Sequence, residues 1–294
     1  MSDTMFDQQL EEFDPTQISH KKMITIPVLI IIIFALLTVL PFVISDYSGH
    51  LKLRMGMDLQ GGTLALIAGE EFDSTLSTEL EDHFDIFGIE VRSTSLGISV
   101  EAPAEVDLVE LENFLREKYP QSEISTSYIG PTMGEDLQEQ ARNALIIAFI
   151  GMTIVVFIAF RSPLPSFVVI LSAISDMIMA IGFMVIFGVA LELGTIAALL
   201  MVIGYSVDSN ILLTTKLLKR RGALKEKVRG AMSTGITMTL TTIAAIFSLF
   251  IISTHPVLDS IAIVLLFALF ADLMNTWMLN TGILMWYLKR RGKA

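Results

Sequence analysis

Six long apolar stretches run along the chain, and polar segments separate them. A helix of about 20 apolar residues crosses a hydrocarbon core of about 30 Å, and every stretch is long enough to do so. The pattern predicts a membrane all-α bundle of six transmembrane helices. They are expected at residues 24–45, 139–160, 165–187, 194–215, 235–254 and 258–287.

Residues 46–138 lack such stretches and show short alternating runs instead. Strands are predicted at LRMGMDLQGGTLALIA, IEVRST, GISVEA and SEISTSYIG, where apolar and polar residues alternate between turn residues. Helices are predicted at 76–87 and 104–119, where apolar residues recur every three or four positions. The order βαββαβ predicts one external α+β domain with a ferredoxin-like fold. The apolar face of the first helix and its C-cap glycine are Leu76, Leu80, Phe84, Phe87 and Gly88.

Lysine and arginine lie at alternate connections between the spans, which predicts the orientation of the chain. The connections VALELG and STHPVLDS hold neither residue. We therefore expect a multi-pass protein of the cytoplasmic membrane with both termini in the cytoplasm and one external domain. The expected regions are a cytoplasmic tail at 1–23, span one at 24–45, the external domain at 46–138, spans two to six within 139–288 with a basic cytoplasmic loop at 216–234, and a cytoplasmic tail at 289–294.

Two details of this topology have alternatives. The first span has an apolar run of about 22 residues and no A-x-A-like site, so we expect a retained span and not a cleaved signal peptide, whose core is about 7–15 residues. The basic loop at 216–234 marks topology, and we expect it to contact anionic membrane lipids. A contact with the ribosome or with a protein channel is the alternative.

Composition excludes several classes of function. Only 17% of the 294 residues are charged, whereas soluble domains have about 25%. The net charge of −11 argues against nucleic acid as a partner, and most of the excess acid lies in the external domain. The chain has no cysteine, and its four histidines are scattered through tails, loops and the external domain, so we expect no metal site and no cofactor.

Three carboxylates lie inside predicted spans: Asp176, Asp208 and Asp272. At 1.5 Å per residue each is about 12–22 Å from the nearest end of its span, close to the middle of the membrane. An ionisable residue there costs about 2.5–3.5 kcal/mol on insertion scales. No lysine or arginine lies at a similar depth. Each carboxylate is therefore expected to be protonated, paired with another subunit, or coordinated to a cation.

Polar side chains accompany these carboxylates. Thr234, Thr237 and Thr241 fall on one face of the fifth span, and the sixth span carries Asn275 and Asn280. The threonines either line an ion path or allow close helix packing, and the asparagines are interpreted mainly as interhelical hydrogen-bond donors and acceptors.

Three short motifs are spread over the chain. MGMDLQGGT (55–63) has the spacing G-x-D-x-x-G-G, which by itself indicates a tight turn or bulge. YIGPTMGEDL (128–137) links the last strand of the external domain to the second span and indicates a structural joint. GYSVD (204–208) lies within the fourth span.

Together, in this order on a six-span frame, the motifs resemble the SecD/SecF protein-export family. The motif positions are Gly56, Asp58, Gly61, Gly62, Gly130, Pro131, Gly134, Gly204 and Tyr205. The resemblance covers nearly the whole chain from about residue 20, and one short external domain is typical of the SecF branch in its archaeal form. Two departures are visible. DLQGG is closer to the motif that is usual in SecD. Ser233-Thr234-Gly235 stand where bacterial relatives carry a basic residue.

The resemblance implies a function and partners. It implies an auxiliary subunit of the Sec translocase that pairs with SecD into a twelve-span unit similar to resistance-nodulation-division transporters. It further implies contacts with the SecY channel and the translocating polypeptide, coupling to a proton or sodium gradient, and no enzymatic activity. The motif falls on Asp208, so the resemblance favours an ion-coupling set of Asp208, Asn210, Thr237 and Thr241, with Asp176, Asp272 and Asn275 as secondary polar positions.

Two other functions fit parts of the pattern. Half of a small-molecule or ion efflux pump would also have six spans, but it would have a larger external domain. An intramembrane aspartyl protease uses two aspartates that share a proton, but the segment before Asp208 lacks the second glycine of a G-x-G-D motif. Co-purification with SecD and SecY separates the first alternative, and a cleavage assay separates the second.

Overall fold

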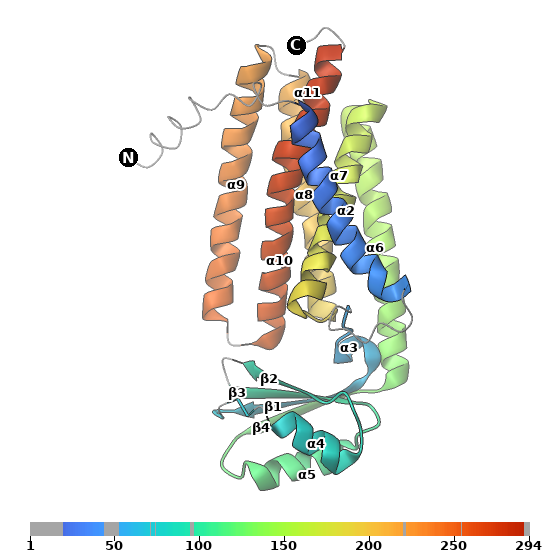
Figure 1. The fold of residues 1–294 in the computed structure, drawn as a ribbon, viewed down its shortest axis with the longest axis vertical. Helices are drawn as coiled ribbons and strands as arrows, with labels where there is room; N and C mark the ends of the chain where they lie inside the picture. Colours follow the sequence, from blue (N-terminus) through green and yellow to red (C-terminus); the bar gives the residue numbers. More distant parts are fainter. Residues whose placement is uncertain are drawn as a thin grey trace, which may run out of the picture.

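The computed structural model describes residues 20–43, 53–70, 72–73, 75–94, 97–219, 222–253 and 255–290. A bundle of long helices and a small α/β domain lie end to end along the longest axis (Figure 1). Six helices are long and apolar enough to cross a membrane, and the α/β domain contains a four-stranded antiparallel sheet. The predicted fold class is confirmed.

The bundle contains every span predicted from the apolar pattern. Proline occupies the first turn of three of its helices, where the missing N–H has no partner to lose. The last span is continued by a π-helix and a further α-helix. The elements are α2 (His20–Val43), α6 (Pro131–Phe160), α7 (Pro163–Phe187), α8 (Leu193–Lys219), α9 (Leu224–Ile252), α10 (Pro256–Met274), η1 (Asn275–Asn280) and α11 (Thr281–Arg290).

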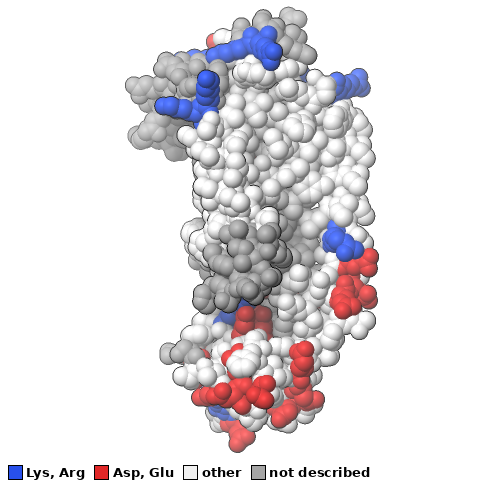
Figure 2. All heavy atoms as spheres, turned by 45° about the vertical axis from the view of Figure 1, so that its right-hand side comes forward, with Lys and Arg blue, Asp and Glu red and all other residues white. Residues whose placement is uncertain are grey.

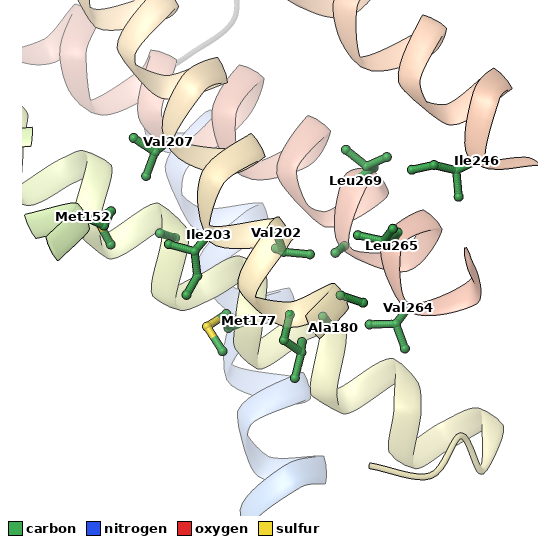
Figure 3. Packing of buried hydrophobic residues seen from close by; sticks show 14 of the residues in the cluster. Met152, Met177, Ala180, Val202, Ile203, Val207, Ile246, Val264, Leu265 and Leu269 are labelled. Carbon is green, nitrogen blue, oxygen red and sulfur yellow. The ribbon is translucent and has the colours of Figure 1, made fainter. Parts of the chain in front are cut away.

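Helices α7, α8 and α10 form the centre of the bundle. About 61% of the apolar window of α7 is buried, against 11% in α2 and in α6, which lie at the periphery. Apolar side chains of α7, α8 and α10 point toward one another in Figure 3, among them Ala180, Val202 and Leu265. The exposed apolar side chains of the peripheral helices suit contact with lipid or with another membrane subunit.

Glycines allow three close contacts between helices of the bundle. A Cβ at Gly182 would lie 2.4 Å from the ring of Phe34 on α2. A Cβ at Gly235 on α9 would lie 2.2 Å from the ring of Trp277 on η1. Gly194 has a similar contact with Val257. Small residues at these points let the helices approach one another closely.

The α/β domain has the predicted βαββαβ order, but Met57–Gln60, within the first predicted strand, form a four-residue helix ahead of it. Its elements are α3 (Met57–Gln60), β1 (Gly62–Ala68), α4 (Leu76–Phe84), β2 (Glu90–Thr94), β3 (Gly97–Pro103), α5 (Leu108–Lys118) and β4 (Ile124–Ile129). The strand order is β2-β3-β1-β4, and every neighbouring pair is antiparallel. Gly62 aligns with Pro103 of β3 and Ile129 of β4.

The two faces of this sheet have different environments. Helices α4 and α5 cover the face that points away from the bundle (Figure 1). The apolar core lies between them, where Ile98 and Val100 of β3 pack with Leu80 of α4 and Leu111 of α5. The opposite face, which carries the alternate residues of each strand, looks toward the outer ends of the bundle helices.

Both longer helices of the α/β domain differ from their predicted limits. Helix α4 ends at Phe84 because Asp85 adopts a left-handed conformation, so Phe87 lies outside the helix and is 88% exposed. The apolar face predicted to include Phe87 therefore ends at Phe84. Helix α5 begins at Leu108 because the Asp107 carboxylate accepts hydrogen bonds from the N–H groups of the first turn.

The predicted basic loop at 216–234 is mostly helical. Helix α8 continues to Lys219 and α9 begins at Leu224, so the helices extend beyond their apolar windows. Lysine in the last turn of α8 is favourable for the helix dipole, which explains why the basic residues do not interrupt the helix.

Charged residues segregate to the two ends of the molecule. On the face seen in Figure 2, Lys and Arg gather at the end of the bundle farthest from the α/β domain, and Asp and Glu gather on that domain. The belt between them is largely uncharged. The start of α2 and the end of α11 both lie at the basic end (Figure 1).

Candidate functional site

A group of polar side chains is buried in the bundle where α7, α8 and the α10–η1 segment meet. Every one of its members is at most 2% exposed. We call it the buried network, and its members are Asp176 on α7, Ser206 and Asn210 on α8, Asp272 on α10, and Asn275, Thr276 and Asn280 on η1.

Both carboxylates of the buried network accept hydrogen bonds from neutral donors. Ser206 Oγ donates to Asp176 Oδ2 at 2.5 Å, and Asn275 Nδ2 donates to Asp176 Oδ1 at 2.6 Å. Thr276 Oγ1 donates to Asp272 Oδ1 at 2.9 Å. Asp176 and Asp272 are near enough to interact electrostatically. The network thus places two acidic groups beside each other in an apolar bundle.

Asn210 joins α8 to the last span. Its Nδ2 donates to the backbone carbonyl of Ser206 at 2.7 Å. Its Oδ1 accepts from Thr276 Oγ1 at 3.3 Å and from Asn280 Nδ2. The side chain amide is therefore saturated by contacts within the network.

The π-helix η1 carries three members of the network. In a π-helix each N–H bonds to a carbonyl five residues earlier, and such turns are frequent at functional sites. Asn275 and Asn280 are five positions apart and so lie on nearly the same side of η1. The hydroxyl of Thr281 donates to the carbonyl of Thr276 at 2.9 Å, which helps to satisfy the altered backbone.

The predicted ion-coupling set is divided between the inside and the outside of the bundle. Asn210 is buried in the network, whereas Asp208 is exposed on the surface of α8. Thr237 and Thr241 are also exposed, and their hydroxyls donate to backbone carbonyls of their own helix at 2.8 Å. The structure thus brings Asn210 together with Asp176, Asp272 and Asn275, and it leaves the other three residues on the outer surface.

Asp208 and Thr241 nevertheless share a depth in the bundle. Lys216 Nζ on α8 contacts Thr234 Oγ1 on α9 at 2.6 Å, which aligns the two antiparallel helices. Asp208 lies eight residues before Lys216 and Thr241 lies seven residues after Thr234, so both are about 10–12 Å from that contact. The exposed surface of this chain therefore carries a polar band near the middle of the span.

The first motif clamps the α/β domain to the outer end of the bundle. Gly56 N donates to Leu191 O at 2.9 Å, and Leu191 N donates to Arg54 O at 2.7 Å. The Asp58 carboxylate accepts from the N–H of Leu193 at 3.4 Å, at the N-terminus of α8. An anionic group is favourable at that end of a helix. A motif interpreted as a simple turn is thus a connection between domains.

The second motif packs against the first. A Cβ at Gly134, in the first turn of α6, would lie 2.8 Å from the carbonyl oxygen of Leu59 and 2.9 Å from the N–H of Gly61. Gln138 Nε2 donates to the same Leu59 oxygen at 2.6 Å. Gly61 has φ of +79°, which favours glycine. Gly130 is the N-cap of α6 and Pro131 its first residue.

A cavity of about 380 Å³ lies between the sheet and the bundle, beside this junction. Its charged lining residues are Asp58, Arg92, Glu101, Glu192 and Asp259. Burial, reinforced by the neighbouring Glu101 carboxylate, raises the pKa of Glu192 to about 7. Arg54 and Arg92 oppose that rise. Among the described residues, no group of three His, Cys, Asp or Glu side chains is placed to hold a metal ion.

Comparison with known proteins decides the family. The family "Protein export membrane protein SecD/SecF, C-terminal" matches residues 110–290. The SecF protein-export membrane protein of Pyrococcus furiosus is 43% identical over 97% of this chain and 95% of its own length. That of Methanocaldococcus jannaschii is 40% identical over 92% of this chain and 96% of its own length. The chain belongs to the SecF proteins of the SecD/SecF family.

Solved SecDF structures share this fold. The crystal structure of a translocon-associated SecDF from a Thermus species aligns with 89% of this chain with a TM-score of 0.68 at 19% identity. A second SecDF structure aligns with 91% with a TM-score of 0.58 at 22% identity. This chain spans 38% of each of those longer chains. The likeness to resistance-nodulation-division transporters stays a prediction.

The remaining motif residues lie on α8 and α9. Gly204 and Tyr205 lie with Asp208 on the exposed side of α8. In the segment Ser233-Thr234-Gly235, Gly235 lies against the Trp277 ring. A larger side chain at Gly235 would meet that ring, so the packing of α9 on η1 accounts for glycine at this position.

Sequence reasoning missed Ser206 and Thr276 as members of the buried network. Their spacing offers a signal, because Ser206 is four residues before Asn210 and Thr276 is four residues after Asp272. Positions four apart lie on the same face of a helix. Two such polar pairs in otherwise apolar spans indicate faces that meet each other.

Proposed function

We propose that this SecF protein acts with SecD as an auxiliary subunit of the Sec translocase and promotes export of polypeptides across the cytoplasmic membrane. The observation that carries the proposal is the identity of 34–43% to SecF proteins over nearly the full chain. We expect no catalytic activity of its own and no cofactor.

SecD is the proposed partner for the exposed polar side of α8 and α9. A carboxylate such as Asp208 in contact with lipid at mid-span costs about 2.5–3.5 kcal/mol. A second six-span subunit over Asp208, Thr237 and Thr241 would remove that cost by covering the polar band. The SecDF chains of known structure, which are much longer than this chain, agree with a second half of this kind.

We propose that the basic end of the bundle is cytoplasmic and that the α/β domain is external, because Lys and Arg favour cytoplasmic ends. The α/β domain would then contact the emerging polypeptide, while the bundle docks near the SecY channel. The exposed Asp208 is proposed to couple this work to an ion gradient by changing its charge at the interface with SecD. An ion-driven efflux pump half is the second reading of the same fold.

Co-purification tests the assignment of partners. The tagged chain is expected to bring down SecD and SecY from native membranes, and an efflux pump half would bring down neither. Export of a secreted polypeptide by inverted vesicles is then measured with and without an ion gradient. Asp208→Asn should keep SecD bound but remove the gradient-dependent part of export, while Met201→Leu on the same exposed side of α8 serves as the matched control. Export in Asp208→Asn that responds fully to the gradient contradicts the coupling role.

A further inference from the structure

We propose that the buried network binds one monovalent cation of the size of Na⁺, at a site separate from Asp208. The site is formed by Asp272, Asn275 and Asn280, with Asp176 as a second carboxylate beside them. It lies inside this subunit, so its occupancy does not depend on whether Asp208 couples export to a gradient.

The first observation is a surplus of buried acceptors. Within the described part of the chain, Asp272 Oδ2, Asn275 Oδ1 and Asn280 Oδ1 have no hydrogen-bond donor, although their residues are 2%, 0% and 1% exposed. A buried polar atom without a partner costs about 1–3 kcal/mol. Three such atoms in one network indicate that a positively charged or donating group belongs there.

The surplus does not come from misoriented amides. Asn275 uses its Nδ2 on the Asp176 carboxylate, which accepts but does not donate when ionised. Asn210 uses its Nδ2 on the Ser206 carbonyl, so its Oδ1 faces Asn280, whose Nδ2 must then be the donor. Turning the amide of Asn275 or Asn210 by about 180° would replace a hydrogen bond with a repulsive contact between two oxygen atoms. The free atoms of Asn275 and Asn280 are therefore oxygens.

Thr276 also provides fewer hydrogen-bond donors than its neighbours could accept. Its single hydroxyl proton lies within reach of Asp272 Oδ1 at 2.9 Å and Asn210 Oδ1 at 3.3 Å, but it can serve only one of them at a time. Asp272 therefore has at most one direct donor from this hydroxyl. The hydroxyls of Ser206 and Ser209 also lie close to the same carboxyl as neutral donors, although neither forms a hydrogen bond with Oδ2.

Charge gives the second observation. None of the ion pairs formed by the described residues includes Asp176 or Asp272. Every donor in the buried network is a neutral hydroxyl or amide. An uncompensated buried carboxylate is strongly destabilising, so the network needs either a proton or a cation.

The donor set selects the kind of cation. Carboxylate, amide and hydroxyl oxygens are ligands for hard cations. Both oxygens of Asp176 are already occupied by donors, which leaves one carboxylate oxygen, Oδ2 of Asp272, beside the neutral amide oxygens. One anionic oxygen suits a single positive charge, whereas Ca²⁺ takes six to eight oxygen ligands that include several carboxylates.

The π-helix provides the geometry. A regular α-helix would separate Asn275 and Asn280 by about 140° around the axis, whereas the wider π-helical turn brings them to nearly the same side. The altered turn thus lets both asparagines reach the neighbouring helices, Asn275 to Asp176 on α7 and Asn280 to Asn210 on α8.

The test measures binding of ²²Na⁺ to the purified complex of this chain with SecD, with choline or K⁺ replacing Na⁺ at constant ionic strength. We expect one Na⁺ to bind per chain. Acid should weaken this binding, because a proton on Asp272 occupies the same oxygen. Asp272→Asn should weaken binding at least about tenfold, which equals about 1.4 kcal/mol. Asn280→Ala, which keeps both carboxylates, should weaken it to a lesser extent.

Asp136→Asn, which changes an exposed carboxylate near the start of α6, is the matched control and should bind Na⁺ like the natural chain. The absence of Na⁺ binding in the natural complex overturns the proposal, as does displacement of Na⁺ by micromolar Ca²⁺. Loss of binding in Asp208→Asn with retention in Asp272→Asn places the site elsewhere and also overturns it. The pH dependence of the natural complex and the Asn280→Ala variant keep the test decisive where Asp272→Asn does not assemble.

Discussion

In the described part of the chain, carboxylates are partly buried at one place and fully buried at another, and they are compensated in different ways. At the junction between the α/β domain and the bundle, Asp58, Glu101 and Glu192 face Arg54 and Arg92 beside a cavity. In the buried network, Asp176 and Asp272 face only neutral donors among the described residues. The junction supplies its own positive charge, whereas the network must take a proton or a cation from outside.

This difference suggests that the junction carboxylates serve stability, whereas the carboxylates of the buried network can respond to ions. At the junction Arg92 pairs with Glu101 inside the protein, although burial still raises the pKa of Glu192 to about 7. A carboxylate without a cationic partner changes its state when the ion concentration changes. The following experiments test whether the two places respond as this comparison requires.

The largest effect is expected for Asp176→Leu. The change leaves Ser206 Oγ and Asn275 Nδ2 without their acceptor, at about 1–3 kcal/mol each, so the free energy of unfolding should fall by about 2–6 kcal/mol. Denaturant unfolding of the chain in detergent without SecD measures it. Asp208→Leu, on the exposed side of α8, should change that value by less than about 0.5 kcal/mol. Equal losses of stability in both variants would contradict the distinction between the buried network and the exposed side of α8.

Gly134→Val should disrupt the junction but not the network. The new side chain meets the Leu59 carbonyl and the Gly61 N–H, and such overpacking costs about 1–3 kcal/mol. Hydrogen exchange should rise at Gly56, Leu191 and Leu193, whose backbone bonds join the two domains. Gly151→Ala on the same helix, where a Cβ meets nothing within 4 Å, is the control. Unchanged exchange at the junction contradicts the clamp.

Glu192 should give the junction a pH dependence. Its pKa is raised to about 7 in the folded state, against 4.5 when unburied, so the folded state keeps a proton that the unfolded state has released. The contribution of Glu192 to stability therefore falls as pH rises from about 4.5 to about 7, by at most about 1.4 kcal/mol per pH unit, and is constant above that range. Hydrogen exchange at Leu191 and Leu193 across this range measures it. Glu192→Gln should lack this part of the pH response, and an unaltered response in that variant would show that another group titrates.

The smallest effect is expected for Arg92→Met. Arg92 pairs with Glu90 at 2.9 Å and with Glu101 at 3.6 Å, but these side chains are 19–35% exposed. Pairs that water can reach contribute about 0–1 kcal/mol. Thermal unfolding should therefore shift only slightly, and the shift should shrink further in high salt. A loss of stability comparable to that in Asp176→Leu would mean that water is excluded from the junction as fully as from the buried network.

The sequence predicts the architecture well because its patterns are strong. Long apolar runs define the spans, and alternation with turn residues defines the βαββαβ domain. The limits of elements depend on local backbone conformation, which is why Asp85 ends α4 before Phe87 and why the basic loop at 216–234 is largely helical.

The site is harder to predict because α7 and α10 are apolar on all sides. A span of this kind has no polar stripe to indicate which face a single aspartate occupies. Asp176, Asp208 and Asp272 therefore look alike in depth, and only packing separates the buried pair from the exposed residue. The π-helical turn at Asn275–Asn280 has no sequence signal that we can identify.

Infrared spectroscopy of the carboxyl groups tests the central claim most directly. Without Na⁺, the purified complex should show a protonated carboxylic acid band at neutral pH, because the buried network then holds a proton in place of a cation. Addition of Na⁺ should weaken that band in the natural chain and in Asp136→Asn, but Asp272→Asn should show no such change. A band that saturating Na⁺ leaves unchanged, or an identical Na⁺ response in Asp272→Asn, would contradict the account.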